Sequence, residues 1–468
     1  MADLSAPERG ALDAPWGVLE AVDARRSKRA YERVERDKVP KLFGTVVDYA
    51  GLFNRPPKGM PGHHSPSRPR IGFLRQTVPG LVSTYWLRTA DGQELADISS
   101  RSGKLREMFG AHAVRFEEGS ADLVDPGEKI NHRMHVLWRD PLPRDQPWPW
   151  GPPAQPGQYP GVPDPLTGVT PGYATWRHDR KMPAVGFAMT ETLRLLEAPL
   201  AGVHFGVFGK TNAGKSYTMR SLAALVGTWQ PPAVDRPHRC IIFCVGDTKH
   251  SFANQLEPRC TIVARTPEDI EAMFMAVQRF LDRRQRRKTT MEGIVWPTEA
   301  APLVWIFIDE LATYMEAGSS ADKRRRELVL TNAARTIREA GGVLVIGMQH
   351  PYAHTLPPSV RGNISFSMQH QMDREEQISL GLNPGWQEFV SIKDVRRLSQ
   401  GAFMYSRGAL GGPSAAEEYG DVRRARGLLL SEGEFTWVMG QSSVFRPQAE
   451  ELQRDWHEAR RFVSDVAA

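Results

Sequence analysis

The stretch from Val207 to Arg220 reads VFGKTNAGKSYTMR, and it decides what the rest of the chain is built around. An apolar run ending at Phe208 precedes it as a predicted strand, and Tyr217 to Val226 follows as a predicted helix. Between them stand a glycine, four residues, and then Gly-Lys-Ser. Glycines leave room for backbone N–H groups to converge on anionic oxygens where a helix begins. The pattern therefore predicts a phosphate-binding loop, or P-loop.

A P-loop in this context predicts ATP and Mg²⁺ as cofactors. Lys215 would reach the β- and γ-phosphates, and the Ser216 hydroxyl would ligate Mg²⁺. The alternative is a glycine turn with an incidental lysine, and the flanking strand and helix favour the P-loop over it. The predicted nucleotide-binding residues are Gly209, Lys210, Thr211, Asn212, Ala213, Gly214, Lys215, Ser216 and Tyr217.

A second element, PLVWIFIDELATYM, runs from Pro302 to Met315. Its unbroken apolar run, Leu303 to Ile308, predicts a buried parallel strand that delivers Asp309 and Glu310 to its carboxyl end. Ligands bind at that edge in open α/β sheets. Asp309 suits the outer coordination sphere of Mg²⁺, and Glu310 is placed to polarise the water that attacks the γ-phosphate.

A third predicted strand, Gly341 to Pro351, ends at Gln349. A polar side chain there, beside the acidic strand, can hydrogen-bond the γ-phosphate or its water; a simple loop glutamine is the alternative. Upstream, Thr331 to Ala340 is a predicted helix that carries Arg335 and Arg338. These are surface arginines, or one of them reaches a neighbouring subunit's site as a charge-stabilising finger.

Composition limits the classes of protein that this chain can be. The 468 residues are 41% hydrophobic and 24% charged, enough for two or three domains, and no apolar run has the length of a membrane span. The N-terminus lacks the pattern of a signal peptide, so we expect a cytoplasmic protein. Cys240, Cys244 and Cys260 lack metal-ligand spacing and are expected to be reduced core thiols. A net charge of +6 and a pI near 9.2 favour a polyanionic partner.

Changes in amino-acid composition along the chain predict four regions. Residues 1–70 form a basic, partly irregular N-terminal arm with a mixed-charge helix at Leu19–Arg36; residues 71–140 form a small α+β domain. Residues 141–175 are a Pro/Gly-rich linker, although a ligand for a proline-recognition domain is an alternative, and residues 176–468 are the ATPase domain. The small domain is expected to hold strands at Gly80–Arg88, Ala113–Gly119 and Met134–Arg139 and a helix at Leu95–Phe109.

Two more elements of the ATPase domain are predicted after the P-loop. A buried strand spans Cys240–Val245, and a long amphipathic helix spans Thr266–Arg287. The basic end of that helix, Arg283 to Lys288, has two open interpretations. It contacts phosphates, or it stabilises the carboxyl end of the helix, where cations are favoured.

Together these residues resemble the motor of the FtsK/SpoIIIE family of double-stranded DNA translocases, within the class that includes conjugative-plasmid transfer ATPases. GKTNAGKS resembles the family's GTTGSGKS-like loop, and IDELA matches its Walker B segment. REAGGVLVIGMQHP, from Arg338, resembles the family's Arg-Ala-Ala-Gly-Ile-His run into Ala-Thr-Gln-Arg-Pro. SVRGNISFSM and GAFMYSR resemble the strands that close the family's sheet, and PGLVSTYWLR through MHVLWRD resembles the small α+β domain that accompanies the motor. The likeness therefore extends from about residue 71 to the C-terminus.

The resemblance implies an α/β fold, a RecA-like P-loop NTPase domain with a mainly parallel sheet, preceded by a small α+β domain. It assigns Gln349 as the sensor and prefers Arg338 to Arg335 as the finger that acts on a neighbouring subunit. It also implies a homohexameric ring around duplex DNA. Ser367 stands where the family often has an arginine. The family's membrane-spanning N-terminus and its winged-helix domain are not recognised, so any anchoring is expected through a membrane-associated partner protein.

The predicted function is therefore ATP-driven translocation of double-stranded DNA, for plasmid transfer or chromosome segregation. One rival is a motor of the same fold that moves protein substrates, as EccC-type secretion ATPases do. Another rival is a nucleotide-gated scaffold in a transfer complex. The single P-loop and the missing anchor favour DNA, and the full set of Lys215, Asp309, Glu310 and Gln349 disfavours a scaffold.

Overall fold

The structure is a computed structural model of the chain, and its contacts divide it into two compact units. The first unit is Met1–Pro143 with Glu191–Arg194, and the second is Arg144–Thr190 with Leu195–Ala468. The residues that the structure describes are 39–50, 52, 58, 67–78, 82–90, 93–117, 132–138, 142, 184–191, 195–228, 241–287, 302–384, 386–388, 390–407, 422–427, 430–443, 446–447 and 449–467.

The first unit contains a four-stranded antiparallel sheet in the order β1-β2-β4-β3. Tyr85, Val114 and Met134 from three of its strands share one core with Ile98 and Leu105 from helices. The three predicted strands are present as β2, β3 and β4. The elements of this unit are α3 (Val39–Ala50), β1 (Arg70–Val78), β2 (Val82–Arg88), α4 (Leu95–Ser99), α5 (Ser102–Phe109), β3 (Ala113–Glu117) and β4 (His132–Leu137).

Helix α3 lies within the segment that the sequence assigned to a partly irregular arm, and the sequence analysis did not predict it. Val39, Phe43 and Val47 recur at helical spacing and are buried in the core of the first unit. Pro40 stands in the first turn, where its missing N–H has no helical acceptor in any case. The predicted helix at Leu19–Arg36 lies outside the described residues, as does the predicted linker except for Leu142.

The predicted helix at Leu95–Phe109 is two helices, α4 and α5. Around the break, the hydroxyl of Ser99 donates to the carbonyl of Ala96 (3.1 Å), and the hydroxyl of Ser100 donates to that of Asp97 (2.8 Å). Serine side chains that bond nearby carbonyls compete with helical backbone bonds. Three serines within four residues, at 99, 100 and 102, therefore interrupt the helix.

The second unit is built on a ten-stranded sheet in the order β6-β5-β14-β13-β12-β7-β11-β10-β8-β9. From β12 to β9 all neighbouring strands are parallel, whereas β6, β5, β14 and β13 pair antiparallel. The strands are β5 (Ala184–Thr190), β6 (Leu195–Pro199), β7 (Phe205–Phe208), β8 (Ile241–Gly246), β9 (Cys260–Ala264), β10 (Leu303–Ile308), β11 (Gly342–Met348), β12 (Phe366–His370), β13 (Ala402–Arg407) and β14 (Arg423–Gly427).

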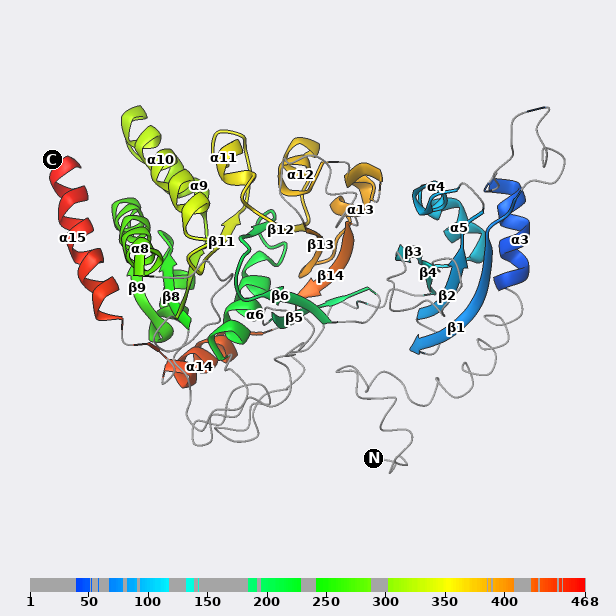
Figure 1. Ribbon diagram of the computed structural model, residues 1–468, viewed down its shortest axis with the longest axis horizontal. Coiled ribbons are helices and arrows are strands. Elements are labelled where there is room, and N and C mark those ends of the chain that lie inside the picture. The colour runs from blue at the N-terminus through cyan, green and yellow to red at the C-terminus, as the bar shows by residue number, and fades with distance from the viewer. Residues whose placement is uncertain are drawn as a thin grey trace, which may run out of the picture. The chain divides into compact units, whose positions relative to one another are not determined.

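Helices cover both faces of this sheet (Figure 1). Along β10, Trp305 and Phe307 face one core and Ile306 and Ile308 face the other, which is why the strand is apolar at every position. The helices are α6 (Lys215–Thr228), α7 (Ser251–Leu256), α8 (Pro267–Arg287), α9 (Leu311–Glu316), α10 (Ser320–Thr336), α11 (Pro358–Arg361), α12 (Glu375–Gly381), α13 (Ile392–Arg396), α14 (Glu432–Ser442) and α15 (Glu450–Ala467).

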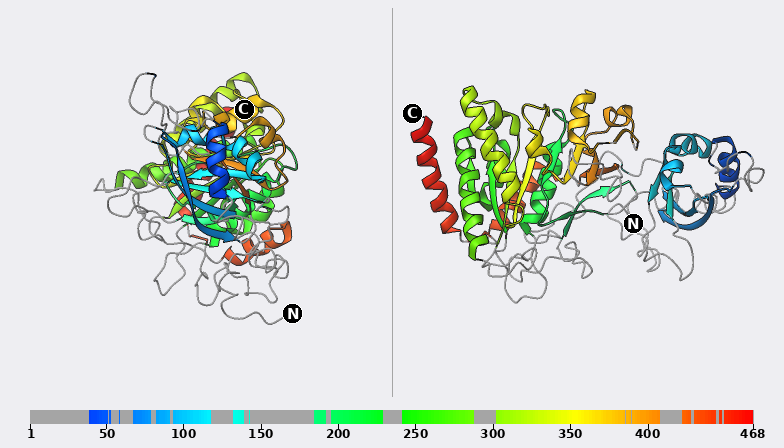
Figure 2. Two further views of the ribbon diagram at one scale, coloured as in Figure 1. Left: turned by 90° about the vertical axis from the view of Figure 1, so that its right-hand side faces the viewer. Right: turned by 45° about the horizontal axis from the view of Figure 1, so that its top comes forward.

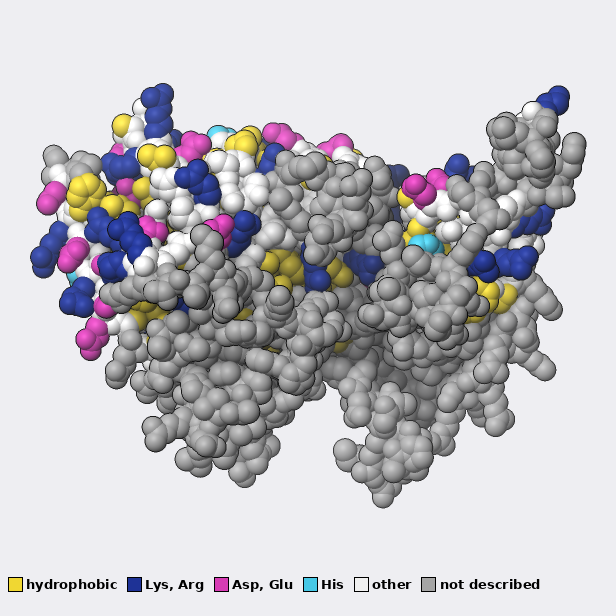
Figure 3. All heavy atoms as spheres, viewed as in Figure 1, with side chains coloured by type: hydrophobic (Ala, Val, Ile, Leu, Met, Phe, Trp, Pro, Cys, Tyr) yellow, Lys and Arg dark blue, Asp and Glu magenta, His cyan; other side chains and the backbone are white. Residues whose placement is uncertain are grey.

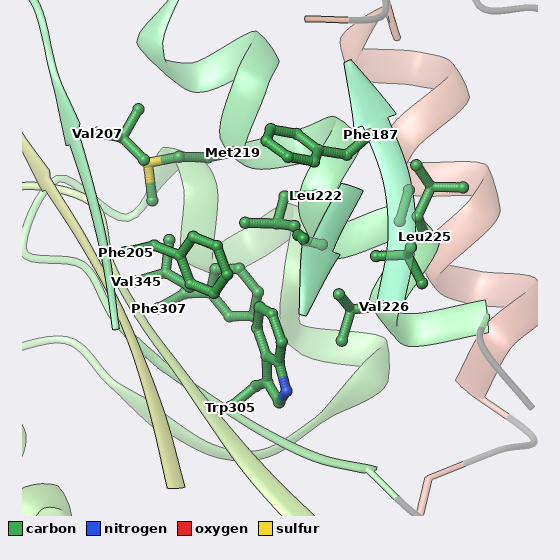
Figure 4. Packing of buried hydrophobic residues seen from close by; sticks show 14 of the residues in the cluster. Phe187, Phe205, Val207, Met219, Leu222, Leu225, Val226, Trp305, Phe307 and Val345 are labelled. Atoms are coloured by element: carbon green, nitrogen blue, oxygen red, sulfur yellow. The ribbon is translucent and has the colours of Figure 1, made fainter. Parts of the chain in front are cut away.

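The P-loop helix α6 packs into the first of these cores. Its side chains Met219, Leu222 and Val226 face Phe205 and Trp305 of the sheet (Figure 4). The strand that leads into the P-loop and the strand that carries Asp309 and Glu310 are thus fixed to the same helix. The second unit is an α/β structure with a mostly parallel sheet, which is consistent with a P-loop NTPase fold.

The C-terminal helix α15 packs along α8 (Figure 1 and the right-hand view of Figure 2). Arg283, in the basic end of α8, donates from Nη1 to Asp455 of α15 at 2.9 Å and makes a second, shorter bond to the same carboxylate. Arg284 donates to the carbonyl of Pro302 at 2.5 Å. These two arginines therefore join α8 to α15 and to the start of β10, a structural role that neither interpretation of this basic segment included.

Cys244 and Cys260 are buried free thiols, and burial raises the pKa of each. This confirms the expectation of core thiols for these two, while Cys240 lies outside the described residues. None of the described helices combines the length and the apolar character that crossing a membrane requires.

His204, directly before β7, joins three elements of the second unit. Its Nδ1 accepts a hydrogen bond from the N–H of Leu344 (3.1 Å), and its Nε2 donates to the carbonyl of Ala334 (2.8 Å). This arrangement requires the neutral ring, because a protonated Nδ1 cannot accept. Burial lowers the pKa of His204 from 6.5 to about 4, and the charge of Arg338 acts in the same direction.

We expect acid to destabilise the second unit through His204. The folded-state pKa lies below the unfolded value, so stability is full above pH 6.5 and is lost as the pH falls toward about 4. The loss is about 1.4 kcal/mol per pH unit in this window. Urea unfolding at neutral and mildly acidic pH measures it. His204→Gln, which keeps a donor and an acceptor without titrating, should show a shallower pH dependence; equal slopes for the two proteins would contradict this role.

Candidate nucleotide site

The P-loop connects β7 to α6 at the carboxyl end of the parallel strands. The N–H of Gly209 donates to the carbonyl of Met348 at the end of β11 (3.1 Å), so the first residue of the loop is bonded to the strand next to β7. Gly214 has a φ of +104°, and a Cβ there would lie 2.3 Å from the backbone nitrogen of Gly401. Asn212, with a φ of +64°, is a residue type that tolerates this left-handed conformation. The backbone conformation of the loop therefore depends on having glycine at 214 and asparagine at 212.

Loops from the antiparallel side of the sheet hold the P-loop from outside. The carbonyl of Ala213 accepts from the N–H of Gly401 (2.9 Å), and the N–H of Lys210 donates to the carbonyl of Gln371 (3.1 Å). The Lys210 ammonium donates to both carboxylate oxygens of Asp373, at 3.0 and 3.2 Å. These contacts come from residues more than 150 positions away in sequence, so motif spacing could not predict them.

Lys215, the first residue of α6, is buried and bonded to the end of β10. Its ammonium donates to the carbonyl oxygen of Asp309 at 2.6 Å and to the carboxylate of the same residue at 2.8 Å. The two predicted site residues are thus in direct contact. A charge-assisted bond of this length in a buried setting orients both side chains. A triphosphate would have to compete with Asp309 for this ammonium.

Gly347 of β11 lies between these groups, and the sequence analysis did not identify it. A Cβ at this position would lie 2.4 Å from the Asp309 carbonyl oxygen and 3.0 Å from the Lys215 ammonium. Because β11 runs between β7 and β10, any larger residue here would separate the P-loop lysine from the acidic strand. A glycine inside a predicted apolar strand, two positions before Gln349, was the available signal.

Glu310 is buried, and its carboxylate is held by the next strand. The backbone N–H of Gln349 lies 3.2 Å from each of its two carboxylate oxygens. The Gln349 side-chain oxygen in turn accepts from the hydroxyl of Thr211 in the P-loop (3.3 Å). Gln349 therefore links the P-loop to the carboxylate that the sequence proposed as the base.

Burial raises the pKa of Glu310, and the nearby charges of Lys215 and Lys249 and the Gln349 N–H only partly oppose this effect. A raised pKa brings a carboxylate closer to the proton affinity that general-base catalysis uses. The environment of Glu310 therefore differs from that of an exposed surface carboxylate and suits the predicted role.

The donor set is suited to Mg²⁺. Asp309 offers a carboxylate and Ser216, the second residue of α6, offers a hydroxyl; both are oxygen donors of the kind that this cation takes. Within the described ranges no group of three or more His, Cys, Asp or Glu side chains gathers as a metal site. Mg²⁺ would then depend on phosphate and water oxygens for the rest of its coordination, which is its usual mode with nucleotides.

Two predicted residues lie apart from this cluster. Arg338 precedes β11 and therefore lies at the amino edge of the sheet, near His204, whereas the P-loop lies at the carboxyl edge. The seven residues of β11 separate the two edges by about 20 Å. Arg335 is exposed in the last turn of α10. Neither arginine is brought to the P-loop of its own chain.

Two further residues named in the sequence analysis, Tyr217 and Ser367, make local contacts. Tyr217 lies in the first turn of α6, with the guanidinium of Arg220 over its ring at 5.4 Å from the centroid. Ser367 is buried in β12, and its hydroxyl donates to the carbonyl of Gly381. Ser367 therefore serves the packing of α12 against the sheet in this structure.

Comparisons with known proteins do not show a family for this chain. No protein-family model and no curated protein matches the chain. Among solved structures, the chain is similar to the pCW3 conjugation coupling protein TcpA in its monomer form with ATPgS. The identity is 14% over 85% of this chain and 97% of that one, with a TM-score of 0.46.

Two secretion ATPases are also similar. The cytoplasmic domain of the Thermomonospora curvata type VII secretion ATPase EccC is 16% identical over 57% of this chain and 32% of that chain (TM-score 0.40). EssC (ATPases 2 and 3) from Geobacillus thermodenitrificans is 14% identical over 60% and 49% (TM-score 0.35). The chain thus spans less than half of either secretion ATPase structure. Likeness at this level assigns no residues and no substrate.

We expect Gly347→Ala to disrupt the site. The added methyl group would overlap the Asp309 carbonyl and displace the Lys215 ammonium, so ATP affinity should fall and the folded state should lose about 1–3 kcal/mol. Gly440→Ala in helix α14 is the matched control, because a Cβ there meets nothing within 4 Å. Thermal unfolding and titration with a fluorescent ATP analogue measure both. Wild-type affinity in Gly347→Ala would show that β11 does not set this contact.

Proposed function

We propose that this chain is an ATP-hydrolysing motor with a RecA-like ATPase domain that translocates double-stranded DNA. The observation that supports hydrolysis is the convergence of Lys215, Asp309, Glu310 and Gln349 at one edge of a parallel sheet. A protein that only bound nucleotide would need the P-loop but not a buried carboxylate fixed beside it.

The residues divide the chemistry between them. Lys215 would leave Asp309 for the β- and γ-phosphates and neutralise their charge, while the P-loop N–H groups bind phosphate oxygens. Glu310 would accept a proton from the attacking water, and Gln349, in contact with both the loop and Glu310, would respond to loss of the γ-phosphate. Mg²⁺, held by Ser216 and Asp309, would supply further positive charge at the phosphates.

Double-stranded DNA is the proposed substrate on the basis of charge and motif resemblance. The chain carries a net charge of +6 with a pI near 9.2, which favours a polyanion. The face drawn in Figure 3 is mixed in charge: over α8, α10 and α15, Lys and Arg side chains lie among Asp and Glu side chains. The charge argument for DNA therefore rests on the net charge of the chain. Plasmid transfer or chromosome segregation is the process that this substrate would serve.

A second proposal concerns assembly. Transition-state charge on the γ-phosphate is commonly neutralised by an arginine, and Arg338 lies at the wrong edge of its own sheet to supply one. It is free to act only on the nucleotide of a neighbouring copy, so we propose a homo-oligomer, a hexameric ring around the DNA, with each site completed at a subunit junction. A cytoplasmic location, with recruitment to the membrane by a partner protein, remains part of this proposal.

We expect Lys215→Ala and Glu310→Gln each to abolish DNA-stimulated ATP hydrolysis. Glu310→Gln keeps size and removes the base, so the rate should fall by about 10²-fold or more while ATP binding persists. The measurement is the ATPase rate with and without linear duplex DNA over a salt series, since phosphate contacts weaken steeply with salt. A normal rate in Glu310→Gln would remove this residue from the mechanism.

The same assay separates the substrates. Stimulation by duplex DNA supports the translocase, whereas stimulation by peptides alone would favour a motor or scaffold of a secretion complex that acts on proteins. Absence of hydrolysis under every condition would leave a nucleotide-gated scaffold.

Mixing inactive subunits tests the junction. Arg338→Ala removes the finger and Lys215→Ala removes the P-loop cation, so neither variant should hydrolyse ATP alone. In mixtures, a Lys215→Ala subunit would present its intact Arg338 to an intact P-loop, and part of the activity should return. Arg335→Ala serves as the control and should keep the wild-type rate. No recovery at any mixing ratio would contradict a role for Arg338 at the junction.

A further inference from the structure

The loop between β8 and α7 is held tightly at the carboxyl edge of the sheet, beside the strand that carries Glu310. Asp247 is buried, and its carboxylate accepts from the backbone N–H groups of Lys249 (2.8 Å), Phe252 (2.8 Å) and Ala253 (3.0 Å). A carboxylate at the amino end of a helix is stabilised by such groups. The main chain at Lys249 is therefore fixed by a buried charge.

The next residue, His250, has a backbone conformation that its surroundings must hold in place. His250 has a φ of +63°, a left-handed conformation that only a small share of non-glycine residues adopt. Strained backbone persists where surrounding contacts determine it, and such positions are frequent at functional sites. Here the hydrogen bonds that Asp247 accepts from the N–H groups of Lys249 and Phe252, on either side of His250, hold His250 in this conformation.

The fixed loop directs Lys249 to Glu310. The Lys249 ammonium lies 3.7 Å from Oε2 of Glu310; the lysine side chain is 45% exposed and the glutamate side chain only 7%. On its other side the carboxylate meets the Gln349 N–H. Glu310 is thus held between a backbone donor from β11 and a cation from the β8–α7 loop, one strand away on either side of β10.

Turnover would change which cations accompany Glu310. Lys215 and Lys249 are two cations whose charges favour the ionised form of Glu310. In the reaction proposed above, Lys215 turns to the phosphates. Lys249 lies on a different loop and has no phosphate contact in that reaction, so it stays paired with Glu310 when the triphosphate binds.

We propose that Lys249 is a positioning residue for hydrolysis: it holds the Glu310 carboxylate toward the attacking water while Lys215 is engaged by the triphosphate. This inference rests on the proposed ATPase function and deepens it. Lys249 contacts neither the phosphates nor the water in this scheme, so its loss should slow the chemical step and leave nucleotide binding intact.

The test compares steady-state kinetics of Lys249→Met, Lys249→Arg and wild type. Lys249→Met should lower kcat by about tenfold or more, since small misplacement of a catalytic group is costly, with KM and the Kd of a fluorescent ATP analogue within about twofold of wild type. Lys249→Arg keeps the cation and should recover most of the lost rate. Lys323→Met, at an exposed position on α10, is the control and should match wild type.

Each other outcome has a defined meaning. A wild-type kcat, or a raised kcat, in Lys249→Met overturns the inference while leaving the ATPase intact. A parallel loss of ATP binding would make Lys249 a nucleotide ligand instead, and failure of Lys249→Arg to recover activity would exclude the ion pair as the cause. If wild-type protein hydrolyses no ATP, it is the proposed function that fails.

Discussion

The contact between Lys215 and the end of β10 is the constraint on which the site depends. It requires the loop after β7 and the residue after β10 to meet, although β11 lies between these two strands, and β11 permits this only because Gly347 has no side chain. The ammonium then reaches both a backbone carbonyl and a carboxylate of Asp309. Removal of Asp309 alone would leave the lysine buried without its charged partner, which is strongly destabilising.

The same strand order explains the arrangement of the polar groups around Glu310. Gln349 directly follows β11, the strand between the P-loop strand and the acidic strand, so its main chain meets Glu310 and its side chain meets Thr211. On the opposite side of β10, the loop after β8 brings Lys249. Each group comes from the tip of a different parallel strand, and the carboxyl edge of such a sheet is where separate loops converge.

The rigidity behind this edge comes from packing and from buried polar bonds deeper in the second unit. The strands are apolar on both faces because helices cover both, and α6 fixes the P-loop to strands β7 and β10 through Phe205 and Trp305. His204, directly before β7, adds hydrogen bonds at the amino edge of the sheet: one to Leu344 near the start of β11 and one to Ala334 of α10. Arg326 of α10 similarly donates to the carbonyl of Ala317 at 2.6 Å and pairs with Glu268 of α8.

The sequence by itself determined the P-loop, the acidic strand and several other strands and helices of the second unit, because local periodicity and glycine placement reflect local backbone geometry. It placed the P-loop between a strand and a helix, and it put Asp309, Glu310 and Gln349 at strand ends. It missed α3, whose apolar stripe stands among prolines and glycines, and it joined α4 and α5. Only the tertiary structure decided the strand order, and with it the roles of Gly347 and Lys249 and the separation of Arg338 from its own P-loop. These depend on contacts between residues distant in sequence, which no local pattern encodes.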